Sequence, residues 1–171
     1  MRDRRHAASV KDMRFVLAAA TLAGLVALAV PQPAQAGQSS AKQGFDWAKS
    51  VPWRTWDQAV VEAKRTKKPI CVVVYTDWCP RCRELAPIFD MPKISGLAKK
   101  FVMVHQNRDH APPWLKKFSE TGEYIPRVLF LNSKGELQKD ITSGSARYPY
   151  FYSVQGWRAL VASMNNALAR K

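Results

Sequence analysis

The most constraining feature of this sequence is a tryptophan-led dithiol motif, Trp-Cys-Pro-Arg-Cys, at residues 78–82. It lies where an apolar run typical of a buried strand, residues 69–75, gives way to a helical pattern, residues 83–89. Two cysteines three positions apart on the first turn of a helix can close into a small disulfide ring. The helix N-terminus favours the thiolate of Cys79, because unpaired backbone N–H groups and the positive end of the helix dipole lie there. A thiolate beside a second thiol, Cys82, is the minimum apparatus for dithiol–disulfide exchange.

The N-terminal residues have the pattern of a secretory signal peptide. An uncharged apolar run at residues 15–30 follows Arg14 and is succeeded by two prolines and a small-x-small sequence at residues 34–36. The run is shorter than the roughly 20 residues that a membrane-spanning helix needs, so a cleaved signal is preferred to an uncleaved anchor. We therefore predict a signal peptide at residues 1–36, a mature chain that begins at Gly37, and a periplasmic or secreted location.

The chain is strongly basic, with 27 Lys and Arg against 13 Asp and Glu and a net charge of +14. Loss of residues 1–36 would remove five basic and two acidic residues and lower this charge to +11. Such a charge could favour acidic partners or anionic membrane surfaces. No compact Lys/Arg block interleaves with aromatic residues, so a solvated basic surface is the preferred interpretation. Nucleic acid is not expected as a partner of an exported protein, nor is stable membrane insertion after signal cleavage.

Three cysteines lie outside the predicted signal peptide: Cys71, Cys79 and Cys82. An odd number suits one working pair plus a spare better than a multi-bridge scaffold. Cys71 falls within the apolar strand, where cysteine behaves as a small buried hydrophobe. His105 and His110 could complete a tetrahedral metal site with the two motif cysteines, but no His-x-x-x-His element supports this. We therefore expect neither a metal nor another cofactor.

The order of the predicted elements indicates a single α/β domain, with helices around a mixed sheet. A capping box at Thr55 and Gln58 begins a helix that ends near the basic run at residues 64–68. Pro87 should kink the helix that follows the dithiol. The other predicted elements are short helices at 94–100 and 114–118, strands at 69–75, 101–105 and 128–131, a hairpin strand at 136–141, and a closing helix at 156–170.

The motifs resemble those of thioredoxin-fold proteins. Residues 82–88 are similar to the thioredoxin helix after the second cysteine, and residues 124–130 resemble the cis-proline loop and the strand that follows it. A narrower resemblance, to the small single-domain thioredoxin proteins of the endoplasmic reticulum including the anterior gradient type, covers nearly the whole mature chain. It rests on residues 51–55, 101–104, 122–131 and 150–152.

This resemblance implies an α/β, thioredoxin-like fold in which α-helices flank a central mixed β-sheet. The expected domain spans residues 51–171 and is preceded by a flexible segment at residues 37–50. The endoplasmic-reticulum relatives carry a retention tail, whereas this chain ends Ala-Arg-Lys. A signal peptide without such a tail leads us to expect a bacterial periplasmic member.

The resemblance also implies the roles of several residues. Cys79 is expected to be the exposed nucleophile and Cys82 the partly buried resolving thiol. Trp78 is expected to shield one side of the sulfurs. A cis peptide bond before Pro126 would bring the backbone of Ile125 beside the dithiol, where it would pair with a substrate peptide.

Two further positions bear on the redox properties of the dithiol. Pro80 and Arg81 separate the cysteines and are expected to set the redox poise; Arg81 would favour the Cys79 thiolate unless it points to solvent, where screening leaves its effect small. Thioredoxins usually bury an acid six residues before the first cysteine, and this position is Val73 here. Removal of the proton from Cys82 is therefore expected to be slow.

Together these features predict an exported thiol–disulfide oxidoreductase that acts as a monomer. Its expected partners are cysteine-containing protein substrates and a protein that restores its redox state. One alternative is a redox-inactive binding or chaperone-like module, against which the intact dithiol argues. A second alternative is a copper- or zinc-handling protein. Oxidase, reductase and isomerase share this apparatus, so the direction of exchange is left open.

Overall fold

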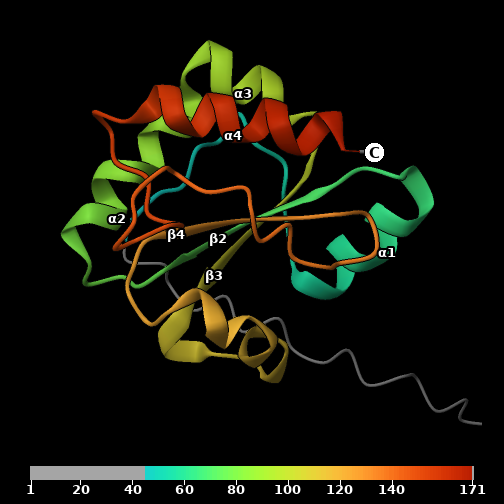
Figure 1. The fold of residues 1–171 in the computed structure, drawn as a ribbon, viewed down its shortest axis with the longest axis horizontal. Coiled ribbons are helices and arrows are strands. Elements are labelled where there is room, and N and C mark those ends of the chain that lie inside the picture. The colour runs from blue at the N-terminus through green and yellow to red at the C-terminus, as the bar shows by residue number, and fades with distance from the viewer. Residues whose placement is uncertain (1–44, 171) are drawn as a thin grey trace, which may run out of the picture. The chain divides into compact units, whose positions relative to one another are not determined.

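The computed structural model describes residues 45–170, so the predicted signal peptide and the predicted start at Gly37 lie outside the described residues. The described chain forms a four-stranded sheet in the order β1-β3-β2-β4, with helices on both of its faces (Figure 1). The predicted mixed sheet is confirmed, since β3 runs parallel to β1 and β2, whereas β4 is antiparallel to β2. The strands are β1 (Trp53–Arg54), β2 (Ile70–Tyr75), β3 (Val102–Asn107) and β4 (Arg127–Leu131).

One helix begins, and another changes type, where local sequence signals predict. The Thr55 hydroxyl accepts a hydrogen bond from the Gln58 N–H, and the Gln58 side chain accepts one from the Thr55 N–H, which completes the capping box. Near Pro87, which has no N–H to donate, the chain changes from α-helix to 3₁₀-helix. The α-helices are α1 (Trp56–Thr66), α2 (Pro80–Leu85), α3 (Pro92–Ala98) and α4 (Trp157–Ala169), and the 3₁₀-helices are η1 (Ala86–Asp90), η2 (Arg108–His110) and η3 (Pro113–Thr121).

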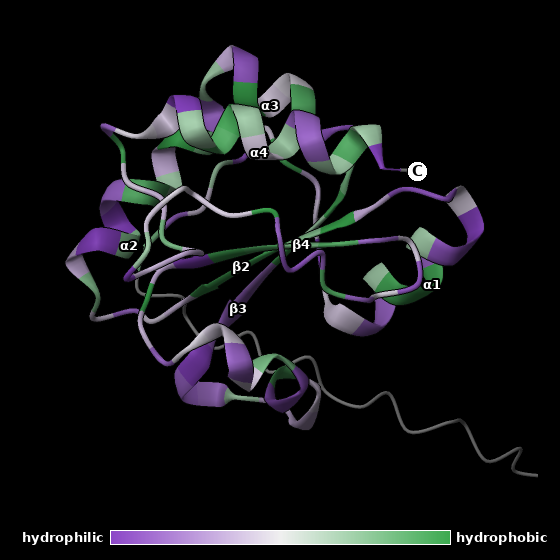
Figure 2. Cartoon of the chain, viewed as in Figure 1, coloured by the Kyte–Doolittle hydropathy of each residue, from purple (hydrophilic) through white to green (hydrophobic). Residues whose placement is uncertain are grey.

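The central strand β2 separates two hydrophobic cores, and all six of its residues are buried. Because side chains alternate along a strand, Cys71, Val73 and Tyr75 join the core that contains residues of α2, α3 and α4. The intervening residues of β2 join the core beneath α1 and η3. Figure 2 shows the hydrophobic residues of β2 and β4 at the centre of the fold. Cys71 is fully buried, as its place in an apolar run predicts.

One edge of the sheet is a very short strand, and the other edge is hydrogen-bonded to neighbouring segments. At one edge, β1 consists of only two residues. At the other edge, the Val128 N–H donates to the Tyr150 carbonyl at 2.8 Å. The Gln138 N–H donates to the Phe130 carbonyl at 2.9 Å. The outer side of β4 is therefore hydrogen-bonded to the two segments that follow it in the chain.

One predicted boundary and one predicted strand are wrong. The flexible segment was expected to extend to residue 50, yet Trp47 and Ala48 are buried, because the Trp47 indole packs between Tyr75 and neighbouring aromatic rings. Among the described residues, the domain therefore begins before Val51. The predicted hairpin strand at residues 136–141 is reduced to a single bridge between Leu131 and Leu137.

Among the described residues, no helix is both long and apolar enough to cross a membrane.

Candidate redox site at the end of the central strand

The two motif cysteines lie together at the start of α2, directly after β2. Cys79 is the N-cap residue, with extended backbone angles, and its Sγ accepts a hydrogen bond from the Cys82 N–H at 3.2 Å. The Cys82 side chain is one turn further along the same short helix. Both residues are free thiols. The strand, turn and helix predicted from the sequence therefore bring a reduced dithiol to one end of β2.

The prediction that Cys79 is exposed is wrong, because only 4% of its surface is accessible and Cys82 is fully buried. The capping hydrogen bond turns the Cys79 sulfur back over the first turn of α2, into the core that also contains Leu85. Trp78, by contrast, is 61% exposed. A substrate therefore has access to only a small part of Cys79 and to none of Cys82.

The surroundings of Cys82 keep its thiol protonated. Burial raises its pKa well above the ordinary value, and the hydrogen bond with Cys79 raises it further, whereas the Thr76 backbone and the charge of Arg108 lower it. Val73, at the position where thioredoxins usually bury an acid, is fully buried and has no carboxylate to offer. Tyr75 cannot substitute as a base near neutral pH, because burial raises its pKa to about 12.

A chain of hydrogen bonds ties the dithiol turn to the end of β3. The Trp78 indole N–H donates to the Asp109 carboxylate at 2.8 Å. The Asp109 N–H donates to the Asn107 side-chain oxygen at 2.8 Å, and the Asn107 amide nitrogen donates to the Asp77 carboxylate at 2.9 Å. Asp77, Asn107 and Asp109 were not among the site residues predicted from the sequence. An Asx-type cap at Asn107 was the one local signal that could have indicated this turn.

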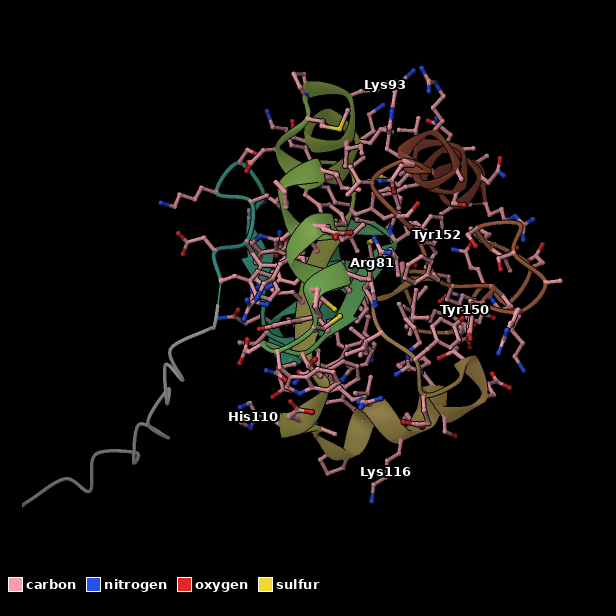
Figure 3. The ribbon with its side chains drawn as sticks, turned by 90° about the vertical axis from the view of Figure 1, so that its left-hand side faces the viewer. Arg81, Lys93, His110, Lys116, Tyr150 and Tyr152 are labelled. Atoms are coloured by element: carbon pink, nitrogen blue, oxygen red, sulfur yellow. The ribbon has the colours of Figure 1, made fainter. Side chains whose placement is uncertain are left out.

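Arg81 takes one of the two positions considered from the sequence, and a second cation near the dithiol was not predicted. Arg81 extends from the outer side of α2, where its guanidinium forms an ion pair with Glu84 at 2.8 Å and 63% of its side chain is exposed (Figure 3). Solvent screens such a pair, so the alternative in which Arg81 points to solvent is the one observed. The cation whose field reaches Cys82 is Arg108, which is 28% exposed and donates to the Glu123 carbonyl. The role of Arg108 was not predicted, because this residue is far from the dithiol motif in the sequence.

The peptide bond between Ile125 and Pro126 is cis. Ile125 packs against the core that contains both cysteines. Arg127, the next residue, is buried and donates to the Thr121 hydroxyl at 2.8 Å and to the Gly122 carbonyl. These contacts fasten the loop at the start of β4. A hollow of about 320 Å³ adjoins the loop and is lined by Tyr124, Ile125, Tyr148 and Phe151.

Among residues 45–170, neither His105 nor His110 belongs to a group of side chains that could hold a metal ion. His105 stacks on Trp47 at 5.2 Å between ring centroids and meets Trp53 edge-on at 5.0 Å. Burial in this aromatic cluster lowers the pKa of His105 to about 4, so the ring is neutral at physiological pH. His110 lies in η2. Within residues 45–170, no three His, Cys, Asp or Glu side chains are close enough together to hold a metal ion.

Comparisons with known proteins agree with this geometry. The profile of a family described as thioredoxin-like matches residues 49–133. Anterior gradient protein 2 homolog of Homo sapiens is 28% identical over 127 residues, which cover 71% of this chain and 69% of the human protein. Anterior gradient protein 3 of Xenopus tropicalis is 27% identical over 128 residues, with 71% and 74% covered.

A solved structure supports the fold independently of sequence similarity. The crystal structure of a poplar thioredoxin h mutant matches with a TM-score of 0.50 at 16% identity, over 74% of this chain and 92% of the poplar protein. At that identity the match bears on the fold alone. The similar structure and the similar sequences thus agree with the thioredoxin-like fold that was expected from the dithiol motif. The described residues have a thioredoxin-like fold, and the chain is similar in sequence to the anterior gradient proteins.

Proposed function

We propose that this chain is an exported thiol–disulfide oxidoreductase that exchanges disulfides with protein substrates through Cys79 and Cys82. The observation that carries the proposal is the pair of free thiols on the first turn of α2, with the Cys79 sulfur 3.2 Å from the Cys82 nitrogen. The thioredoxin-like domain supports this general type of function. Export rests on the signal-peptide pattern of residues 1–36.

The burial of the two sulfurs supports the assignment of their roles. Cys79 is the sulfur that a substrate can reach, because Cys82 is completely covered. The Cys79 thiolate attacks a substrate disulfide, one substrate thiolate leaves, and a mixed disulfide forms. Cys82 then loses its proton and attacks the Cys79 sulfur. This step releases the second substrate thiol and leaves a Cys79–Cys82 disulfide, so two electrons pass to the substrate; oxidation of a substrate dithiol is the reverse sequence.

The surface beside the dithiol supports a polypeptide as the substrate. The Ile125 backbone precedes the cis bond and belongs to a loop that packs against the dithiol core. The adjoining hollow is lined by Tyr124, Ile125, Tyr148 and Phe151, and its volume of about 320 Å³ suits one apolar side chain. We assign this hollow to a side chain that flanks the reactive cysteine of the substrate.

An insulin-reduction assay with dithiothreitol as the electron donor tests the proposal. The parent protein should accelerate the precipitation of reduced insulin, and Cys79→Ser should abolish the acceleration. Cys71→Ala is the matched control, because it removes the one cysteine that is buried in β2, outside the motif, and should leave the activity intact. Cys82→Ser should accumulate mixed disulfides on Cys79. Equal activity of the parent and Cys79→Ser would refute the proposal.

The burial of Cys79 favours a second candidate function, a redox-inactive binding module. Only 4% of this residue is accessible, and an unreactive dithiol would be a structural remnant beside a peptide-binding loop. This candidate predicts that the parent and Cys79→Ser bind an unfolded, cysteine-free polypeptide with the same affinity and that neither reduces insulin. The same pair of proteins therefore distinguishes the two functions.

A further inference from the structure

A cluster of basic residues occupies the end of the domain opposite the dithiol. Lys67, Lys68, Lys99 and Lys100 line a hollow of about 570 Å³, at which the ends of α1, α3 and α4 meet. A second hollow, of about 370 Å³, shares two lining residues with the first and adds two further cations. We call these six cations the basic end: Lys67, Lys68, Lys99, Lys100, Lys134 and Arg170.

The described residues neutralise little of the charge of the basic end. Among residues 45–170, no carboxylate lines either hollow. Arg170 pairs with Asp140 at 2.5 Å. Lys68 donates to the Lys99 carbonyl at 3.0 Å, a contact without charge neutralisation. The C-terminal ends of three helices contribute roughly half a negative charge each, which offsets only part of the remaining five positive charges. The basic end therefore has a strong positive potential.

The position of the basic end leaves the dithiol free. Pro69, which lines both hollows, directly precedes β2, and the dithiol follows the other end of that strand. The six residues of β2 separate the two by about 20 Å at the usual rise of an extended strand. Figure 1 shows α2 at one end of the sheet and the C-terminal end of α4 at the other. A partner bound at the basic end would not cover Cys79.

We infer that the basic end binds the phosphate headgroups of an anionic phospholipid bilayer and docks the protein on a membrane surface with the dithiol directed away from it. Lysine ammonium groups are compact point charges that suit phosphate oxygens. Clusters of four to eight Lys and Arg are typical of surfaces that bind anionic lipids. The inference goes beyond the proposed function and does not depend on the reactivity of the dithiol.

The chemistry of the surface favours a lipid over an acidic protein. Stable protein interfaces are anchored by buried aromatic residues, and none of the described aromatic side chains lines either hollow. The large apolar residues that the described chain exposes (Val61, Trp78 and Tyr148) also lie outside both hollows. Binding would therefore be electrostatic and superficial, and salt should reverse it.

Vesicle co-sedimentation tests this inference with the mature chain. The parent should sediment with vesicles of phosphatidylglycerol and phosphatidylethanolamine but not with vesicles of phosphatidylcholine alone, and about 0.5 M salt should release it. The triple variant Lys67→Glu/Lys99→Glu/Lys100→Glu should bind the anionic vesicles at least about tenfold more weakly, since each lysine near the surface contributes separately.

The matched control is Lys49→Glu/Lys116→Glu/Lys117→Glu. These three lysines are exposed, lie outside both hollows, and produce the same change in net charge. The control should retain at least half of the parental affinity. Thermal melts establish that both variants are folded, and unchanged insulin reduction shows that the dithiol is intact.

Three results would overturn the inference. Equal loss of binding in the two triple variants would mean that only net charge matters. An acidic protein partner would be indicated instead if the parent does not sediment with anionic vesicles but binds soluble polyglutamate, and if the triple variant Lys67→Glu/Lys99→Glu/Lys100→Glu loses that binding. Release of the parent by millimolar inorganic phosphate at constant ionic strength would indicate a site for free phosphate rather than for a bilayer.

Discussion

Trp78, which precedes the reactive cysteine, is held by Asp109, whose carboxylate accepts its indole N–H at 2.8 Å. The most exposed aromatic side chain at the dithiol thus has a fixed orientation although 61% of its surface is accessible. The contact joins the dithiol turn to η2 and so connects two segments that are distant in sequence. Because Trp78 is hydrogen-bonded to a residue of η2, its orientation depends on the conformation of the loop after β3.

The first prediction concerns this contact. Asp109→Ala should raise the KM for insulin reduction about two- to fivefold with little change in kcat, because the freed indole no longer has a defined place beside the bound substrate. Asp109→Asn keeps an acceptor oxygen for the indole N–H and should behave like the parent. Steady-state kinetics of the two variants check this. A change in kcat rather than KM would contradict a positioning role for Asp109.

The second prediction separates two arginines. Burial raises the pKa of Cys82, and the positive charge of Arg108 partly counteracts it. Arg108→Ala should therefore raise this pKa further and prolong the life of the mixed disulfide about two- to tenfold, because Cys82 must lose its proton to resolve it. Arg81→Ala is the matched control and should change the lifetime little, since Arg81 pairs with Glu84 on the exposed side of α2. Quench-flow trapping measures both lifetimes.

The third prediction follows from the buried histidine. Burial holds the pKa of His105 at about 4, below the ordinary 6.5, so the unfolded chain takes up a proton between these values and the folded chain does not. Stability should thus be full well above pH 6.5 and fall towards pH 4, by at most about 3.4 kcal/mol for this group. His105→Phe retains an aromatic ring between Trp47 and Trp53 and should flatten this part of the profile. Urea unfolding at pH 7.0, 5.5 and 4.5 measures the difference, and identical pH profiles for parent and variant would disprove it.

The fourth prediction concerns the hollow beside the cis-proline loop. Tyr148→Ala should raise the KM for insulin about three- to tenfold, because it removes an aromatic wall from the place assigned to a substrate side chain. The same variant should reduce a small disulfide, such as hydroxyethyl disulfide, at the parental rate. Val61→Ala removes another exposed apolar side chain, on α1, and serves as the control. An equal effect on both substrates would place Tyr148 in the support of the fold rather than in peptide binding.

The fifth prediction concerns processing. The protein recovered from an exporting cell should begin at or near Gly37, because residues 34–36 form a small-x-small cleavage site after the apolar run. Intact mass and N-terminal sequencing determine the start. Retention of residues 15–30 in the membrane fraction would indicate an uncleaved anchor.

Local patterns in the sequence predicted the elements that local forces stabilise. The capping box at Thr55, the change of helix type near Pro87 and the buried run of β2 each depend on residues within a few positions of one another. For the same reason the dithiol was placed correctly at the start of α2. The fold class then followed from the order of these elements and from the resemblance to thioredoxins.

Features that depend on distant residues were not predictable in this way. β1 is two residues long and exists only because β3 lies beside it. The influence of Arg108 on Cys82 arises because β3 runs next to β2, and no pattern around the motif indicates it. The burial of Cys79 was also missed, because it depends on the direction in which a capping side chain turns and on the core that receives it.

Under the proposed function, the short β1 edge and the occupied β4 edge determine how an unfolded client can approach this domain. A client chain with exposed cysteines is also a chain with unpaired backbone groups, and a free strand edge would capture it as an additional strand. Here β1 offers two residues, and the outer side of β4 is already bonded to Tyr150 and Gln138. Under the proposed function, the described part of the domain therefore offers an aggregation-prone client little strand edge with which to pair, and contact falls to the loops around the dithiol.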